Sequence, residues 1–291
     1  MDIKLNSMNA AGVVHTHGAV LSSYKNDGVE YVWQGDPKYW SGQAPVLFPV
    51  VCVAMDGKMA HNGVEYPMPA HGFAKDGDFE IVSLSKNSVV LEQRETEETL
   101  KMFPFCYSLK IAYTILDTGF DVRYTVKNLD KNEMTFCIGG HPGFNCPLFD
   151  GDEFEDYKLV FDDAEGCTVS ITKGGHMNDE VPKLDRLRGT NEYELKRSDF
   201  DIDTLIIEGL PKKAFNFVSK NSGRGFRFEF PGFDALALWS PRNKNAPLVC
   251  FEPWNGLTAG DNETTDAKSK KYAKTIAPDE EYSVGYSVTL I

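Results

Sequence analysis

Two short segments of the chain combine an acid–base side chain with a constrained backbone. The first is IGGHPGFN at residues 138–145, where His141 stands among three glycines and a proline. The second is LVCFEPW at residues 248–254, where Glu252 ends an apolar run typical of a buried strand. A proline follows Glu252 and biases it toward an extended conformation, with Trp254 next. A carboxylate at a strand end beside an aromatic ring predicts a pocket there.

These residue types suit a carbohydrate site. Aromatic faces pack on the apolar C–H faces of a pyranose ring, while carboxylate and imidazole groups bind its hydroxyls. Histidine, with an ordinary pKa of about 6.5, also supplies acid–base chemistry near neutral pH. His71, in HGFAKDGDF, stands beside a glycine at a predicted strand edge, much as His141 does. For both residues, the alternative is a structural histidine that is hydrogen bonded to the backbone.

Metal chemistry is weakly indicated. The H-x-H pair of His15 and His17 would share one face of a strand, as ligands do in some metal sites. The next acidic residues, Asp27 and Glu30, lie beyond a turn signal, so we expect structural or surface roles for both imidazoles and no metal. His176 lies in the polar segment KGGHMND and is expected to be exposed.

Composition excludes several classes of protein. The 291 residues carry a net charge of −13, which argues against a nucleic-acid partner and against an anionic membrane surface. The start, MDIKLNSMNAAGVV, lacks the pattern of a signal peptide, and no apolar run approaches the ~18 residues of a spanning helix. The six cysteines form no C-x-x-C pair. We expect reduced, mostly buried thiols in a cytoplasmic protein.

The elements that must position these residues are strands. Apolar residues alternate over 109–115, 120–126 and 134–138, and turn residues separate the three runs. The tetrapeptide GVEY occurs at 28–31 and 63–66, each time after or at a hairpin turn signal. The best helical pattern, from Lys183 to Leu187, is short, and no linker or low-complexity tract divides the chain. These patterns predict an all-β fold, a large sandwich or barrel, as one domain over residues 1–291.

Taken together, the motifs resemble those of the aldose 1-epimerase (galactose mutarotase-like) family, and more closely its LacX-like branch. The resemblance covers nearly the whole chain, and the order and spacing of the motifs carry it. These motifs are GAVLSSYKNDGVEYVWQGDPKYW (18–40), PVLFPVV (45–51), HGFAKDGDF (71–79), IGGHPGFNCPL (138–148) and LWSPRNKNAPLVCFEPWNGL (238–257).

The resemblance implies a fold, an activity and roles for residues. The family has a large antiparallel β-sandwich, the galactose mutarotase-like supersandwich, with few short helices and a sugar cleft. Its members interconvert the α- and β-anomers of aldoses without a cofactor or a metal. The general base matches Glu252, the general acid matches His141, and a histidine that contacts the sugar matches His71.

Further sugar contacts are implied at less distinctive positions. A sugar-binding aspartate matches Asp203 best, with Asp201 as the rival, and Lys75 follows the HGFA segment. Trp254 and Phe73 are expected beside the sugar, where apolar surroundings would desolvate Glu252. The partner is then a small-molecule sugar, and the chain is either a monomer or a homodimer.

The chain departs from the family at two arginine positions, and this leaves alternatives open. Lys75 replaces an arginine that is common in relatives, and Cys52 and Val53 replace a Gly-Arg pair. Lysine offers a point charge in place of a planar fork of donors, and valine offers neither. The alternatives are a non-catalytic carbohydrate-binding or regulatory protein on the same scaffold and a hexose-6-phosphate mutarotase. A glycoside hydrolase would require a second carboxylate, such as Asp203, within about 5–10 Å of Glu252.

Overall fold

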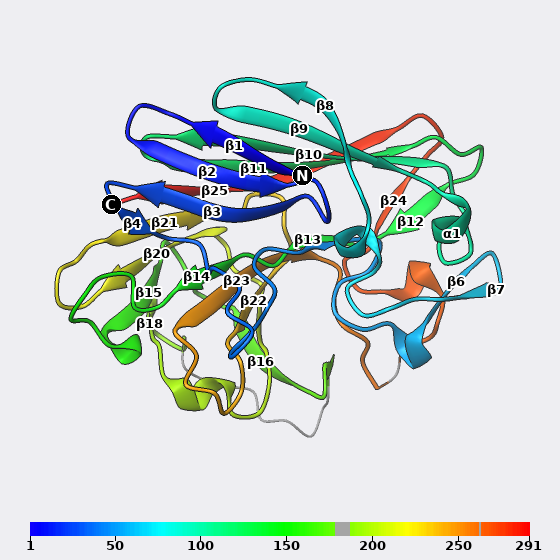
Figure 1. Ribbon diagram of the computed structural model, residues 1–291. Helices are drawn as coiled ribbons and strands as arrows, with labels where there is room; N and C mark the ends of the chain where they lie inside the picture. Colours follow the sequence, from blue (N-terminus) through cyan, green and yellow to red (C-terminus); the bar gives the residue numbers. More distant parts are fainter. Residues whose placement is uncertain (178–186, 262) are drawn as a thin grey trace.

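Two large antiparallel sheets dominate the computed structural model, which describes residues 1–177, 187–261 and 263–291 (Figure 1). The back sheet has the order β18 (Glu192–Glu194), β15 (Tyr157–Phe161), β20 (Ala214–Ser219), β21 (Gly225–Glu229), β25 (Glu281–Leu290), β11 (Gly119–Asn128), β10 (Tyr107–Leu116), β9 (Ser88–Arg94) and β8 (Glu80–Leu84). The site sheet has the order β17 (His176–Met177), β16 (Thr168–Lys173), β19 (Leu205–Glu208), β22 (Ala235–Trp239), β23 (Leu248–Asn255), β13 (Ile138–Gly140) and β5 (Val46–Leu47). The short strand β14 (Gly143–Asn145) also pairs with β23.

Smaller elements flank the two sheets. A third sheet contains β1 (Asp2–Asn6), β2 (Ala10–His15), β3 (Val20–Asn26) and β4 (Val29–Glu30). Two further hairpins pair β6 (Lys58–His61) with β7 (Val64–Pro67) and β12 (Met134–Phe136) with β24 (Lys274–Ile276). The helical elements are α1 (Glu97–Leu100) and the 3-10 turns η1 (Met55–Gly57), η2 (Ala74–Asp76), η3 (Phe154–Asp156), η4 (Arg197–Phe200) and η5 (Ala267–Ser269). Within the described residues, no helix is long and apolar enough to span a membrane.

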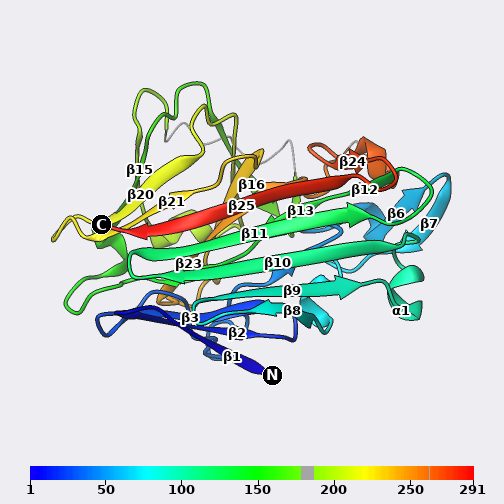
Figure 2. The same ribbon diagram turned by 90° about the horizontal axis from the view of Figure 1, so that it is seen from above.

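The strand and fold predictions are confirmed. The alternating runs become β10 and β11, which pair around the turn at 117–118 and lie side by side in the back sheet (Figure 2). Both GVEY segments lie in hairpins, β3–β4 and β6–β7. The third run differs from the prediction, because it is divided into β12 and β13, which pair in different sheets. The predicted helical pattern falls mostly on residues 178–186, outside the described part of the chain.

Aromatic side chains fill the space between the two sheets. Phe251 of the site sheet packs against Phe217 and Phe226 of the back sheet, with ring centroids 5.1 and 6.2 Å apart. Phe144 packs 4.6 Å from Phe226, in the same cluster. Burial of such rings, at about 25 cal/mol per Å² of apolar surface, is the main force that holds the sandwich together.

Strand β23 has both of its faces buried, and this determines where Glu252 points. Successive side chains of a strand alternate between the two faces. Because Val249 and Phe251 face the core between the sheets, the even-numbered side chains of Cys250, Glu252 and Trp254 face the opposite side. The site is built on this second face.

Candidate active site

His141 stands directly opposite Glu252 across two adjacent strands. The antiparallel ladder pairs Gly139 with Trp254 on one side of the His-Pro step and Gly143 with Cys250 on the other. The register is the same on both sides, so the interruption introduces no shift and His141 falls opposite Glu252. Opposed residues of an antiparallel pair bring their Cβ atoms within about 5.5 Å. The Nε2 atom of His141 lies 3.3 Å from Oε1 of Glu252.

The glycines around His141 provide space for aromatic rings. A Cβ atom on Gly139 would lie 2.8 Å from Cδ1 of Trp254, and one on Gly143 would lie 3.0 Å from Cζ3 of Trp40. Both distances are too short for a real Cβ atom without movement of the neighbour. The small residues therefore let two indole rings approach the strand on either side of His141.

Burial controls the protonation of the acid–base pair. The Glu252 side chain is 2% exposed and the His141 side chain 10% exposed. Burial raises the pKa of Glu252 well above its ordinary value, and the nearby charge of Asp203 adds to this. The indole of Trp254 acts in the opposite direction and lowers the pKa of Glu252, although it forms no hydrogen bond of normal geometry. Burial, reinforced by His71, holds the pKa of His141 well below 6.5.

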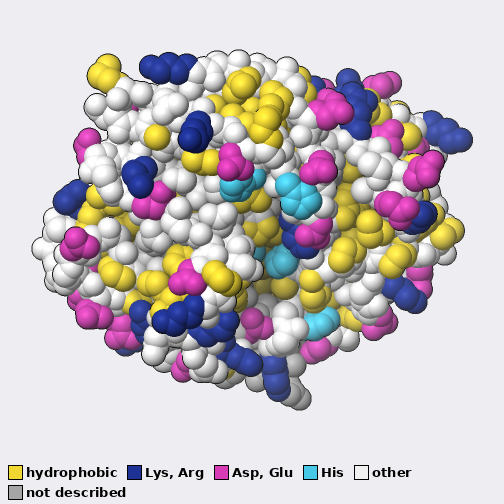
Figure 3. Space-filling model, viewed as in Figure 1, with side chains coloured by type: hydrophobic (Ala, Val, Ile, Leu, Met, Phe, Trp, Pro, Cys, Tyr) yellow, Lys and Arg dark blue, Asp and Glu magenta, His cyan; other side chains and the backbone are white. Residues whose placement is uncertain are grey.

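The pair lies in the wall of a cavity of about 660 Å³. Figure 3 shows histidine side chains gathered around a hollow near the centre of this face of the molecule. The cavity is lined by residues from the site sheet, from β2 and β3, and from the loops around residues 40–53, 70–76 and 175. This volume is within the usual range for small-molecule sites, roughly 300–1,000 Å³.

Two tryptophans that sequence analysis did not assign to the site line this cavity. The ring of Trp40 stacks on His141, with centroids 5.0 Å apart and planes at 25°. Trp239 meets the same imidazole edge-on at 5.6 Å. With Trp254, three of the four tryptophans of the chain line the cavity. Both rings lie within the segments that carry the family resemblance, but so does Trp33, which is not among the residues lining the cavity, so the sequence did not single them out.

The position of His71 determines its tautomer. Nδ1 of His71 accepts a hydrogen bond of 3.1 Å from the backbone N–H of Cys52. Burial, with Lys75 nearby, lowers the pKa of His71 to about 4, so the ring is neutral near pH 7. The ring proton of neutral His71 therefore resides on Nε2. His71 lines the cavity with its ring 5.5 Å from that of His141, and it can donate one hydrogen bond to a bound hydroxyl.

Asp203 and its rival Asp201 occupy different places. Asp203 lines the cavity, where it accepts hydrogen bonds from the backbone N–H of Gly175 at 2.7 Å and from the hydroxyl of Thr204 at 3.4 Å. Asp201 is exposed and borders a separate hollow beside Arg242. The geometry therefore favours Asp203 as the aspartate that a ligand in the cavity meets.

Lys75 and Phe73, the two predicted sugar contacts in the HGFAK segment, also lie in different places. Lys75 lines the cavity, and its ammonium group is paired with the carboxylate of Asp76. Phe73 is not among the residues described as lining the cavity, and it packs against Phe48 and Tyr107 in the core. The prediction that Phe73 contacts the sugar is not supported, because its ring belongs to the core between the sheets.

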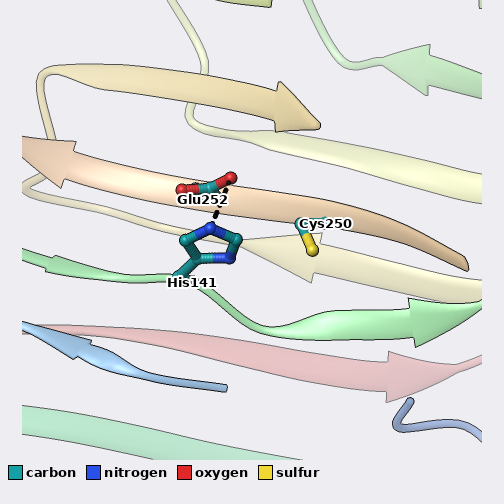
Figure 4. Close-up of side chains that lie close together, drawn as sticks. All are labelled: His141, Cys250 and Glu252. Carbon is teal, nitrogen blue, oxygen red and sulfur yellow. Dashed lines mark ion pairs between the residues drawn. The ribbon is translucent and has the colours of Figure 1, made fainter. Parts of the chain in front are cut away.

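A thiol lies beside the acid–base pair. Figure 4 shows Cys250 and Glu252 projecting from β23 and His141 reaching toward Glu252 from the neighbouring segment. Ligand atoms of the three side chains lie within 4.8 Å of one another, the one group of this kind among the described residues. His15 lines the same cavity and its ring is paired with Asp2, while His17 is paired with Asp78. None of the six cysteines is in a disulfide, and four are buried.

A family model described as aldose 1-epimerase matches residues 2–289 of the chain. The chain belongs to the aldose 1-epimerase family. It is 31% identical to the plasmid and chromosomal LacX proteins of Lactococcus lactis subsp. lactis, over the full length of both chains in each case.

Solved structures of epimerase-like proteins share the fold. A galactose mutarotase related enzyme from Lactobacillus acidophilus superimposes with a TM-score of 0.93 at 26% identity, covering 100% of this chain and 97% of that one. A galactose mutarotase-like protein from Lactobacillus casei gives 0.89 at 29% identity, with complete coverage of both chains. A galactose 1-epimerase from Lactobacillus acidophilus has a TM-score of 0.71 at 13% identity, and the match covers 100% of this chain and 94% of that one. At that identity the likeness concerns the fold alone.

Proposed function

We propose that this epimerase family member is an active aldose 1-epimerase that interconverts the anomers of an unphosphorylated aldohexose or a related saccharide. The observation that carries the proposal is the alignment of His141 opposite Glu252, with Nε2 and Oε1 3.3 Å apart in the wall of an aromatic-lined cavity. Anomer exchange needs a base at the C1 hydroxyl and an acid at the ring oxygen. Glu252 and His141 are the two groups placed to serve these roles.

The reaction needs one proton on the pair at the start. Glu252 takes the proton of the C1 hydroxyl while His141 gives its proton to the ring oxygen, and the C1–O5 bond opens. Rotation about C1–C2 turns the aldehyde, and the ring closes on its other face with the two roles exchanged. The pair holds one proton both before and after turnover, because each proton taken at one oxygen is given at the other.

Burial favours a Glu252–His141 pair that holds one proton in total. A buried pair that holds one proton has no net charge, either as carboxylic acid with imidazole or as carboxylate with imidazolium. Gain of a second proton or loss of the first would leave an uncompensated buried charge, which low polarity disfavours. The opposite pKa shifts of Glu252 and His141 agree with one proton on the pair and favour its position on Glu252 in the free protein, so this proton moves to His141 before the sugar ring opens.

The charges in the cavity favour an unphosphorylated sugar. Among the described lining residues, Lys75 is the one lysine or arginine, and its ammonium group is already paired with Asp76. The carboxylate of Asp203 faces the same space, while Glu252 belongs to the pair that holds one proton and has no net charge. A phosphate would meet net negative charge here, whereas neutral hydroxyls can bind the carboxylates and His71.

The test is the equilibration of freshly dissolved α-galactose or α-glucose, followed by polarimetry or by NMR exchange. We expect the wild-type protein to accelerate it and Glu252→Gln to lose at least about 100-fold of that acceleration, the usual contribution of a general base. Glu65→Gln is the matched control, because Glu65 is an exposed carboxylate on β7 outside the cavity. Sugar binding without acceleration by the wild type would instead support a non-catalytic binding protein.

His141→Asn separates catalysis from binding. An asparagine side chain retains a hydrogen-bond donor but cannot supply a proton at neutral pH. We expect turnover to fall far more than sugar affinity. Equal losses in both would assign His141 to binding only.

A further inference from the structure

We propose that His141, Cys250 and Glu252 form a binding site for a soft divalent cation, with Zn²⁺ as the natural candidate, and that the bound ion inhibits the protein by occupying its acid–base pair. The three side chains are buried on one face of the site sheet, and their ligand atoms lie within 4.8 Å of one another. The inference does not require turnover, because cation binding is measured directly.

The spacing of the acid–base pair fits tetrahedral coordination. Zinc–nitrogen and zinc–oxygen bonds of 2.0–2.2 Å at tetrahedral angles place the two ligand atoms about 3.4 Å apart. The observed separation of His141 Nε2 from Glu252 Oε1 is 3.3 Å. A sulfur ligand, with a bond of about 2.3 Å, would lie about 3.6 Å from each of them. Because the ligand atoms of the three side chains lie within 4.8 Å of one another, the Sγ atom of Cys250 has to move toward the other two before all three can bind one ion.

The strand register places an aromatic ring over the thiol. Cys250 is paired with Gly143, which has no side chain to occupy the space opposite it. The ring of Trp40 covers this position and stacks on His141. His141 and Glu252 line the cavity, so an ion can enter from that side and leave its fourth coordination position to water.

Unsatisfied polar atoms mark the same place. Oε2 of Glu252 and Nδ1 of His141 are buried and have no hydrogen-bond partner. An unpaired buried carboxylate oxygen costs free energy, and a cation would stabilise the carboxylate of Glu252 directly. A thiolate and a carboxylate together carry two negative charges, which a divalent ion neutralises in the buried site.

Binding of the cation releases two protons and involves no electron transfer. The Cys250 thiol and the acid–base pair each release one proton to the buffer as the ion binds, and no oxidant or reductant takes part. His141 then contributes a lone pair and Glu252 an ionised oxygen. Neither group is free to exchange protons with a sugar, so the ion acts as an inhibitor and has no role as a cofactor.

Cobalt provides the probe, because Co²⁺ bound to a thiolate gives a near-ultraviolet charge-transfer band and tetrahedral Co²⁺ gives intense visible bands. We expect the reduced, full-length protein to bind one equivalent of Co²⁺ with both signals and to release it to Zn²⁺. Cys250→Ser should abolish the charge-transfer band and weaken binding at least about tenfold. Cys106→Ser and Cys167→Ser, which alter the two partly exposed thiols, should leave the band unchanged.

Glu252→Gln gives a second test that leaves the thiol intact. It should weaken Co²⁺ binding by a similar factor while the charge-transfer band remains at saturation. The proposal is overturned if the wild type gives no thiolate–cobalt band, or if the band persists in Cys250→Ser. A protein that binds Co²⁺ in this way but does not accelerate anomer exchange would refute the proposed enzyme and leave the cation site standing.

Discussion

Trp40 stacks on the imidazole of His141, with ring centroids 5.0 Å apart and the two planes at 25°. The indole comes from a loop and the imidazole from the segment between β13 and β14. Stacking limits the orientations of the His141 ring, and the face of an indole also attracts a cation. Trp40 therefore restricts the orientation of the imidazole whose Nε2 lies 3.3 Å from Oε1 of Glu252.

We expect Trp40→Ala to slow anomer exchange by about 2- to 10-fold, because a stacked aromatic pair contributes roughly 0.5–1.5 kcal/mol. Trp40→Phe keeps an aromatic face over His141 and should retain most of the rate. Exchange rates at saturating sugar, measured by NMR, compare the two variants. If alanine and phenylalanine reduce the rate equally, the stacking does not orient His141.

The rate of anomer exchange should stay level as the pH falls through 6.5, where an exposed histidine would titrate. Burial lowers the pKa of His141 well below that value, so the pair gains its second proton only in more acidic solution. Burial raises the pKa of Glu252, so the pair keeps its one proton to higher pH than an exposed carboxyl would. Initial rates across pH, after subtraction of the buffer-catalysed reaction, provide the check. An acid limb centred near 6.5 would show that His141 is solvated during turnover.

Gly139→Ala should destabilise the protein by about 1–3 kcal/mol, the usual cost of overpacking. The new methyl group would lie 2.8 Å from Trp254 and 3.0 Å from the backbone oxygen of Pro253, and the latter cannot easily move. Urea unfolding measures the change. Gly260→Ala is the matched control, because its added methyl group would lie 3.8 Å from the nearest atom, an ordinary contact. Equal stability of the two variants would contradict the close packing of Trp254 on β13.

His61 should make folding stability depend on pH away from the active site. It is buried between Phe103 and Phe105 with Nε2 unpaired, and burial lowers its pKa to about 4. The unfolded chain, with a histidine pKa of about 6.5, binds more protons between these values. Stability is therefore fully present above pH 6.5 and is lost as the pH falls toward 4.

His61→Leu should reduce that pH dependence by up to one proton, or about 1.4 kcal/mol per pH unit. His71 contributes with the same sign, so part of the dependence remains. Urea unfolding at pH 7, 6 and 5 measures the slope, and His176→Gln, at an exposed position, is the control. An unchanged slope in His61→Leu would show that His61 is accessible to water.

Much of the fold could be predicted because period-two alternation is a local property. Ile111 and Tyr124 lie in runs that the turn DTG joins, and they pair in the register that such a hairpin requires. The division of the 134–138 run into β12 and β13 could not be predicted, because Phe136 and Ile138 keep one alternation while their strands pair with different sheets. Sheet membership depends on partners that are distant in sequence.

Some residues of the candidate site could be predicted from the sequence and others could not, for a similar reason. Glu252, His141 and His71 lie in distinctive motifs, and the structure brings all three to one cavity. Phe73 lies in such a motif as well, yet its ring faces the core. Trp40 carried no local sign that it would reach His141, because a loop residue is placed by the strands that its loop joins.

By itself, the sequence determined the β-rich architecture, the family and the types of acid–base side chain, because alternation, turns and motifs are written in neighbouring residues. Only the tertiary structure decided that His141 faces Glu252, because that depends on an unshifted register across the His-Pro step. It likewise decided that Cys250 lies beside them and that the pair is buried, since β23 is covered on both faces. Burial raises the pKa of Glu252 and lowers that of His141, and it arises only when distant strands pack together.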